Sequence, residues 1–312
     1  MNKLFVSSSP HLKSTVTTRK IMLDVLIALV PAVIASFVLF GWQSLMLVGI
    51  CVLCCVVSEY FSRIIMKRDN TVGDLSAAVT GVLLALNLPY NINPLIAAFG
   101  SVAAIVVVKQ MFGGLGMNFV NPALAGRVIL LVSFPSQMTS WVGTRFMGGL
   151  DAVTSATPLA SEVGTYSYLD LFLGNHSGSL GETCALALLI GGAYLVIRKV
   201  ISPTIPLITV GTAALMSLVL GRDPLTDVLS GGLLLGAIFM ATDYVTSPIT
   251  FFGKVIYAVG IGALTVLIRE FADLPEGMSF AILLFNILTP LIENITVRKP
   301  FGCEKKKKEG KA

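Results

Sequence analysis

Residues 21–40 read IMLDVLIALVPAVIASFVLF, and this stretch decides the class of fold. It has one charged residue, Asp24, and is as long as an α-helix must be to cross the apolar core of a bilayer. The whole chain has a similar composition, since 55% of its 312 residues are hydrophobic and only 12% are charged. A soluble domain carries about 25% charged residues. The sequence therefore predicts an all-α integral membrane protein, and excludes a soluble enzyme, a disordered chain and a disulfide scaffold.

Further apolar runs, bounded by charges or turn residues, bring the number of predicted membrane-spanning helices to ten. The predicted spans are 21–40, 44–65, 75–88, 92–112, 119–133, 182–197, 204–220, 226–243, 251–268 and 279–296. Two of them, 75–88 and 119–133, are short for a hydrocarbon core of about 30 Å. We expect polar ends to extend these two or neighbouring helices to bury them. No cleavage site follows the first run, which we expect to remain as an anchor.

The positive charges orient these spans. With the N-terminus placed inside, the inner segments hold 18 of the 22 Lys and Arg residues. The outer segments hold Arg145, Arg222 and Arg269, and Arg127 lies within a span. Because cytoplasmic loops are enriched in Lys and Arg, this bias predicts that both termini are cytoplasmic. The net charge of +5 is thus a signal of topology, and no nucleic-acid partner is expected.

The sequence contains an internal repeat. GDLSAAVTGVLLALNLP (73–89) resembles TDVLSGGLLLGAIFMATDYVTSP (226–248), and GMNF (116–119) matches GMSF (277–280). With five spans in each half, the two halves have opposite orientations, which predicts two inverted five-helix repeats with binding sites near the midplane. The expected divisions are an N-terminal cytoplasmic segment (1–20), a first membrane repeat (21–133), an external loop (134–181), a second membrane repeat (182–297) and a basic cytoplasmic tail (298–312).

Polar residues gather unusually in GGLGMNFVNPALAGR (113–127). Asn and Arg are costly within an apolar span and often mark function. Asn118 and Asn121 are three residues apart, so on a helix they would share a face and could present amide groups to a flat polar ligand. The other interpretation is a helix cap followed by a proline in the first turn. Both interpretations remain open at this point.

The remaining polar residues give no sign of a metal centre or of a catalytic group. Cys51 and Cys55 share one face of the second predicted span, and His176 has no neighbouring ligand in the sequence, so small apolar packing explains the cysteines. Glu59 and Arg63 are spaced i, i+4 and could pair with each other. Asp74 and Asp227 open helices at equivalent positions of the repeat, so we expect both to be helix caps. No cation path is assigned from these residues.

Several segments together resemble the RnfD/NqrB family, the membrane subunits of Rnf complexes and of Na⁺-translocating NADH:quinone oxidoreductases. The resemblance covers nearly the whole chain, and the short N-terminal segment looks more like RnfD. Besides 113–127, the resembling segments are SSPHLKSTVTTRKIMLDVLIALVPA (8–32), DAVTSATPL (151–159), GSLGET (178–183), MATDYVTSP (240–248) and EGMSFAILLFNILTPLIE (276–293).

The resemblance implies two flavin cofactors. In the family, a flavin transferase attaches FMN through a phosphoester to the last Thr of the motif that here runs from Asp151 to Thr157. Thr157 would then carry covalent FMN, with Ser155 in place of the usual Gly. The family also holds a non-covalent riboflavin, and its Asn-x-x-Asn pair matches Asn118 and Asn121. Asp243 is a further, weaker candidate for the riboflavin site.

The implied function is that of a flavin-carrying subunit in the inner (plasma) membrane of a bacterium. Its complex would couple electron transfer between ferredoxin and NAD⁺ to outward movement of Na⁺ or H⁺. The implied partners are the other subunits of an Rnf-type complex, the flavin transferase and membrane lipid. The residues alone also allow an inverted-repeat channel or secondary transporter without a redox role, or a structural subunit.

Overall fold

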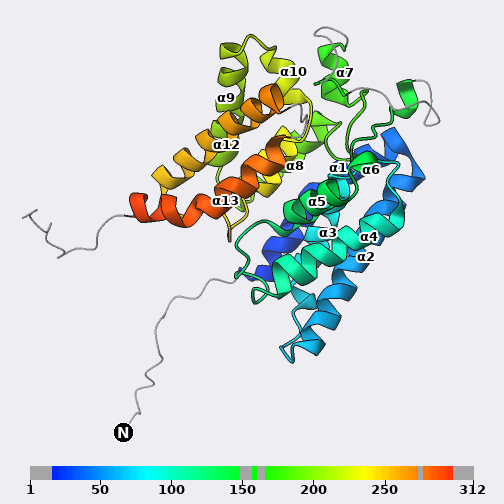
Figure 1. The fold of residues 1–312 in the computed structure, drawn as a ribbon, viewed down its shortest axis with the longest axis vertical. Helices are drawn as coiled ribbons and strands as arrows, with labels where there is room; N and C mark the ends of the chain where they lie inside the picture. The colour runs from blue at the N-terminus through cyan, green and yellow to red at the C-terminus, as the bar shows by residue number, and fades with distance from the viewer. Residues whose placement is uncertain (1–15, 148–156, 160–165, 273–276, 298–312) are drawn as a thin grey trace, which may run out of the picture.

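The computed structural model describes residues 16–147, 157–159, 166–272 and 277–297, and all regular structure in these ranges is helical (Figure 1). Four helices are long and apolar enough to cross a membrane: α1 (Thr18–Phe40), α2 (Trp42–Ile65), α12 (Phe251–Phe271) and α13 (Gly277–Thr296). The shorter apolar helices are α3 (Ser76–Leu86), α4 (Pro94–Ala103) with the π-helix η2 (Ala104–Gln110), α5 (Pro122–Ser133), α8 (Ala185–Ile197) and α9 (Thr204–Val219). The predicted all-α class is confirmed, and nine of the ten predicted spans coincide with these helices.

The tenth predicted span, 226–243, is not one continuous helix. It divides into α10 (Pro224–Leu229), α11 (Leu233–Leu235) and the π-helix η4 (Gly236–Met240). Gly231 turns the chain with a φ of +65°, a conformation that glycine adopts without strain. The buried guanidinium of Arg269 donates to Asp227 O at 2.6 Å and to Ser230 O at 3.3 Å. It thereby satisfies carbonyl groups that the break leaves without helical partners.

The two predicted acidic caps have different outcomes. Leu75 is the N-cap of α3, so Asp74 lies one residue before the predicted place, but its Oδ1 still accepts from the backbone N–H of Ser76 in the first turn at 2.9 Å. Asp227 lies inside α10, so its prediction as a cap is wrong. Asp223 caps that helix instead, and the Asp227 carboxylate binds Arg222 at 3.0 Å. The prediction failed because it took Asp227 as the start of a helix from its match to Asp74 in the repeat, whereas α10 already begins at Pro224.

Helix α3 lies in the interior of the bundle. Ten of its residues are buried, and α1, α2 and α5 pack around it. This confirms the expectation that neighbouring helices bury the short predicted span at 75–88. Between α2 and α3, the short helix η1 (Val72–Asp74) is followed by Leu75 in the left-handed region, with a φ of +66°.

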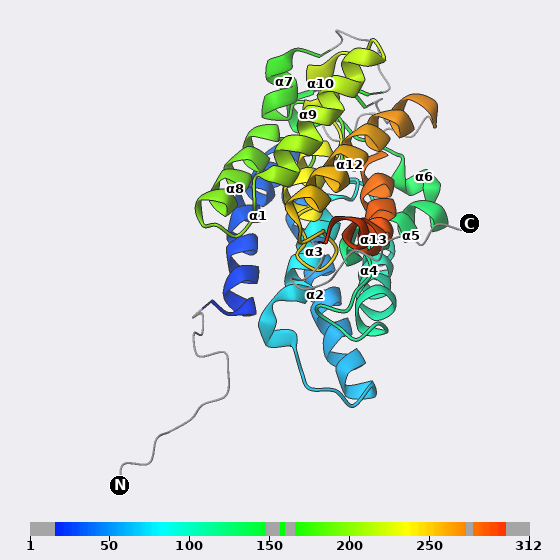
Figure 2. The same ribbon diagram turned by 90° about the vertical axis from the view of Figure 1, so that its left-hand side faces the viewer.

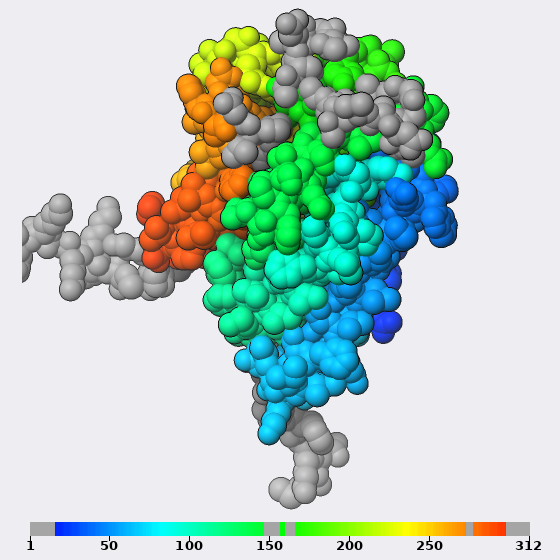
Figure 3. Space-filling model, turned by 45° about the vertical axis from the view of Figure 1, so that its right-hand side comes forward, coloured from blue at the N-terminus to red at the C-terminus, as the bar shows by residue number. Residues whose placement is uncertain are grey.

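The helices form two groups that meet along two contacts (Figures 1 and 2). In the first group α2 packs on α3 and α4; in the second, α12 packs on α9 and α13. The contacts of α1 with α8 and of α5 with α13 join the groups. The α5–α13 contact is visible on the surface in Figure 3, where the orange C-terminal helix lies against a green one. The connection between the groups contains α6 (Pro135–Met138), η3 (Arg145–Met147) and α7 (Tyr168–Leu173).

Candidate functional site

A cavity opens between the two groups of helices at the start of α5, and three of the predicted site residues line it. Asn118, Asn121 and Asp243 all contribute to its wall. It encloses about 780 Å³ of space without protein atoms, part of it open to solvent. We call it the α5 cavity. Its other lining residues are mainly apolar and come from α1, α3, α8 and η4, among them Val25, Val79, Leu83, Leu195 and Phe239.

The α5 wall of this cavity is shaped by an Asn–Pro cap. Asn121 is the N-cap of α5, its Oδ1 accepting from the backbone N–H of Ala123 at 3.0 Å and of Leu124 at 3.4 Å, and Pro122 occupies the first turn. The capping interpretation is therefore confirmed. The expectation that Asn118 and Asn121 share a helical face is wrong, because both precede the first residue of α5. They reach the same cavity through the turn that leads into the helix.

The amide nitrogens of this pair have different partners. Asn121 Nδ2 donates to Met240 O, at the end of the π-helix η4, at 3.4 Å. Asn118 Nδ2 donates to Val120 O at 3.0 Å. Since an amide nitrogen carries two hydrogens, each Asn keeps one N–H beyond these bonds. A capping role and a ligand-binding role are thus compatible at Asn121.

Asp243 lies in the turn that follows η4. Its Oδ1 accepts from the backbone N–H of Val245 at 3.4 Å, and its Oδ2 accepts from Thr246 Oγ1 at 3.3 Å. Each of these oxygens has a second lone pair, so the carboxylate retains acceptor capacity. Thr242 and Tyr244, on either side of Asp243, also line the cavity. The wall therefore combines amide donors from one group of helices with a carboxylate from the other.

Lys109, on the π-helix η2, is a lining residue that the sequence analysis did not select. Its Nζ lies 3.0 Å from Glu59 Oε1 and donates to Ser76 Oγ at 2.6 Å. Glu59 also accepts from Gln110 Nε2 at 2.9 Å, so the suggested pairing of Glu59 with Arg63 is wrong. Lys109 is the one charged residue of the predicted span 92–112, and a charge within a span was the sequence signal that could have selected it.

A second, much smaller cavity lies beside Thr157. Its lining includes Thr157, His176, Gly178, Glu182 and Gly231, and we call it the Thr157 cavity. Thr157 is 7% exposed, and its Oγ1 has no hydrogen-bond partner within the described ranges. Buried hydroxyl groups are usually hydrogen-bonded, so this oxygen is an exception that requires an explanation. The predicted motif residues Asp151 and Ser155 lie outside the described residues.

His176 forms one side of the Thr157 cavity and bonds to backbone groups of the connection between the two groups of helices. Its Nδ1 lies 3.1 Å from Ser177 O, and its Nε2 lies 3.1 Å from Thr183 O. Burial lowers the pKa of His176 below its ordinary value, although these carbonyl groups and Asp170 act in the opposite direction.

A buried ion pair lies between the two cavities. Arg127, in the second turn of α5, has its Nη2 3.6 Å from Glu182 Oε1, and its Nη1 donates to Ser279 Oγ on α13. Glu182 lines the Thr157 cavity and accepts from Ser179 Oγ at 2.9 Å. Helix α5 thus has its cap in one cavity and its arginine paired with a residue of the other. Sequence analysis had noted Arg127 as costly within a span, without a partner for it.

Comparison with known proteins decides the family. The chain matches the sequence profile of the NQR2, RnfD, RnfE family over residues 5–302. The chain belongs to this family. The resemblance stated from the sequence motifs is confirmed, and the matched range includes both cavities.

Curated members of the NQR2, RnfD, RnfE family are similar along their whole length. The D component of the Na⁺-translocating ferredoxin:NAD⁺ oxidoreductase complex of Acetobacterium woodii is 50% identical, with 99% of this chain and 98% of that protein aligned. The D component of the proton-translocating ferredoxin:NAD⁺ oxidoreductase complex of Clostridium ljungdahlii is 40% identical, over 97% and 98% of the two chains. The D component of the ion-translocating oxidoreductase complex of Escherichia coli (strain IAI39) is 33% identical, over 96% and 99% of the two chains.

Within this family member, the predicted site residues fall into two places. Asn118, Asn121 and Asp243 come together in the α5 cavity. Thr157 lies apart from them, in its own cavity. Sequence reasoning missed Lys109, which lines the α5 cavity. Glu182, in the GSLGET segment (178–183) quoted for the resemblance, lines the Thr157 cavity.

Proposed function

We propose that this chain is the flavin-carrying membrane subunit of a bacterial electron-transport complex. The chain is a subunit of an ion-translocating ferredoxin:NAD⁺ oxidoreductase, as the names of its full-length relatives indicate. The complex couples electron transfer between ferredoxin and NAD⁺ to outward movement of Na⁺ or H⁺. The observation that carries the flavin role is the α5 cavity, where Asn118, Asn121 and Asp243 line a mainly apolar chamber. Cofactor sites are typically clefts lined mainly by apolar side chains with a few polar groups that converge on the ligand, as here.

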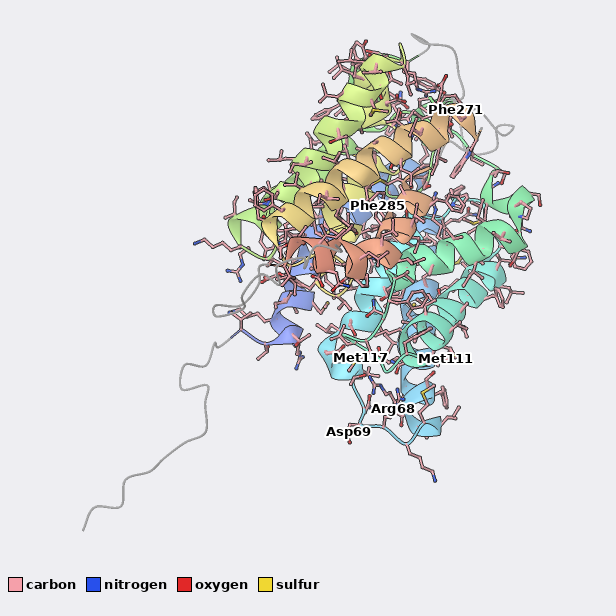
Figure 4. The ribbon with its side chains drawn as sticks, turned by 60° about the vertical axis from the view of Figure 1, so that its left-hand side comes forward. Arg68, Asp69, Met111, Met117, Phe271 and Phe285 are labelled. Atoms are coloured by element: carbon pink, nitrogen blue, oxygen red, sulfur yellow. The ribbon has the colours of Figure 1, made fainter. Side chains whose placement is uncertain are left out.

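The proposed topology has ten membrane segments in two inverted five-helix repeats, with both termini in the cytoplasm. The packing supports it, because α2 on α4 in one group corresponds to α9 on α12 in the other. The contacts that join the groups, α1–α8 and α5–α13, pair helices at equivalent positions of the repeat. In Figure 4, Arg68, Asp69, Met111 and Met117 lie at one end of the molecule and Phe271 lies at the opposite end. The topology assigns those ends to the inside and the outside.

Thr157 is the proposed attachment point of covalent FMN. Its hydroxyl oxygen is buried without a hydrogen-bond partner within the described ranges, so a phosphoester there would break no existing bond. The lining of the Thr157 cavity adds the imidazole of His176 and the backbone at Gly178 as polar neighbours. Because Thr157 is only 7% exposed, a flavin transferase would have to act on it before the chain completes its folding.

The α5 cavity is the proposed site of riboflavin. The apolar walls from α1, α3 and η4 fit a flat ring system, and the remaining N–H groups of Asn118 and Asn121 can donate to its carbonyl oxygens and ring nitrogens. Asp243 can accept from a ring N–H or from ribityl hydroxyl groups. Lys109 lines the same wall, where its ammonium group is paired with Glu59.

When bound, flavin supplies the one- and two-electron chemistry, and the chain supplies position, charge and exclusion of water. The two sites lie on different elements, and α5 connects them through Asn121 and Arg127. Arg127 and Glu182 keep a compensated pair of charges between the cavities. The complex includes further subunits, a flavin transferase matures the chain, and lipid surrounds it in the plasma membrane.

Two variants of the purified complex test the proposal. Thr157→Val should remove the fluorescence of the denatured polypeptide band while released riboflavin stays near one per subunit. Asn118→Leu with Asn121→Leu should do the opposite, since each lost hydrogen bond to a buried polar ligand costs about 1–3 kcal/mol. That is roughly five- to a hundredfold in affinity for each group.

The outcomes separate the candidate functions. A wild-type complex without either flavin would leave a channel or transporter as the better function. A fluorescent band that persists in Thr157→Val would move the attachment to another hydroxyl. Stoichiometric riboflavin in the double Asn variant would restrict Asn121 to its capping role.

A further inference from the structure

Tyr257 and Asn286 form a buried polar pair behind the α5 cavity. Tyr257, on α12, is fully buried, and Asn286, on α13, is 2% exposed. The Tyr257 hydroxyl oxygen lies 2.7 Å from the Asn286 side-chain amide. Both residues come from the second group of helices, and neither is among the described residues that line the cavity. Burial of such groups is costly unless every polar atom is bonded, so the pair calls for a role.

The Asn286 amide reaches the cap of α5. In the amide orientation that gives both of its polar atoms a partner, Oδ1 accepts from the backbone N–H of Asn121 at 3.2 Å, and Nδ2 donates to Ile282 O at 3.3 Å. An N-cap residue precedes the helical ladder, so its own N–H has no partner inside the helix. Asn286 supplies that partner from α13, across the contact that joins the two groups of helices.

Asn121 is thereby fixed from three directions. Its backbone N–H is held by Asn286, its Oδ1 is held by the first turn of α5, and one hydrogen of its Nδ2 is directed to Met240 O. The second hydrogen on Nδ2 is the one left for a ligand of the cavity. The direction of that hydrogen depends on where the Asn121 backbone sits, and Asn286 sets that position.

The face of α13 that carries Asn286 also bonds to the turn that contains Asp243, on the other wall of the α5 cavity. Thr289 Oγ1, three residues after Asn286, donates to Thr246 O at 2.9 Å. Thr246 in turn donates to the carboxylate of Asp243. Residues at i and i+3 lie on one face of a helix, so α13 holds the asparagine wall and the aspartate wall from a single surface.

We propose that Asn286, oriented by Tyr257, is a positioning residue for the ligand of the α5 cavity. It acts through Asn121, without touching the ligand. The inference rests on the proposed riboflavin site and adds a residue outside the cavity that sets the geometry of that site. Nothing in the spanning role of α13 requires an asparagine at this place.

The test compares three variants in the purified complex. Asn286→Leu has nearly the size of Asn but no polar atoms, and Asn286→Asp keeps an acceptor for the Asn121 N–H. Thr296→Val is the matched control, because Thr296 is also a hydrogen-bonded residue of α13, and its partners among the described residues are Ile292 O, Glu293 O and Thr250, away from Asn121. Equilibrium dialysis with riboflavin fluorescence gives the dissociation constant, and covalent FMN on the same chain reports whether the subunit is intact.

We expect Asn286→Leu to weaken riboflavin binding roughly tenfold, the equivalent of one hydrogen bond, while covalent FMN stays in place. Asn286→Asp should recover most of the affinity, and Thr296→Val should bind like the wild type. Unchanged affinity in Asn286→Leu would overturn the inference. If that variant fails to assemble, Tyr257→Phe decides, since it keeps the ring packing: a several-fold loss supports the inference and no loss overturns it. A wild-type complex without riboflavin would instead refute the proposed riboflavin site on which the inference rests.

Discussion

Replacing Lys109 by Met removes the only cation among the described lining residues of the α5 cavity. It also leaves the buried carboxylate of Glu59 without its positively charged partner. Lys109 and Glu59 are 2% and 0% exposed, and their charged atoms lie 3.0 Å apart. Breaking a buried pair by removing one partner typically costs about 3–5 kcal/mol. Here Thr71 and Gln110 still donate to Glu59, at 3.0 and 2.9 Å. We therefore expect a loss near the lower end of this range, about 3 kcal/mol.

The assay is reversible unfolding of the detergent-purified subunit for Lys109→Met, Glu59→Gln and the double variant. The double variant should recover much of the loss, because no uncompensated charge is left inside. Lys67→Met, at an exposed position at the end of α2, is the control and should change stability by less than about 0.5 kcal/mol. A single variant as stable as the wild type, or a double variant no better than Lys109→Met, would refute the reasoning.

Three further predictions concern packing, pH and maturation. Gly191→Ala should destabilise the subunit by about 1–3 kcal/mol, because a Cβ there would lie 2.2 Å from Ala28 O on α1. Gly211→Ala, with nothing within 4 Å of the new atom, should be neutral or slightly stabilising in the same melts. Burial lowers the pKa of His176, so its contribution to stability is complete above its ordinary pKa of about 6.5 and is lost as pH falls through the lowered value. Melting temperatures should therefore drop below about pH 6 in the wild type and drop less in His176→Gln; parallel pH profiles would contradict this. Ser155→Gly should leave in-gel flavin fluorescence unchanged, and a lost band would mean that the motif alignment is wrong.

The apolar runs predicted the helices well because each spanning helix must satisfy its backbone internally and present apolar side chains outward. The same signal could not find the break in 226–243, where Ser230 and two glycines interrupt an otherwise apolar run. That break depends on Arg269, which comes from a helix distant in sequence and bonds the freed carbonyl groups. Local hydropathy contains no information about such a partner.

The candidate site was predicted in part. The Asn–Pro pattern correctly placed a cap at Asn121, and the resemblance brought Asp243 to the same cavity. The pairings of Glu59 and Arg127 depend on tertiary packing, so the helical spacing suggested the wrong partner for one and none for the other. Asn286 is an asparagine within the predicted span 279–296, which is the same kind of signal as Asn121, but its partner appears only when α13 is placed against α5.

The most direct test of the central claim is to count both flavins in one purified wild-type preparation. Mass spectrometry of the peptide that contains Thr157 gives covalent FMN, and chromatography of the acid-released fraction gives riboflavin. The account predicts one FMN on Thr157 and one riboflavin for each copy of this chain. A chain that carries neither flavin, in a complex that still transfers electrons, would contradict it.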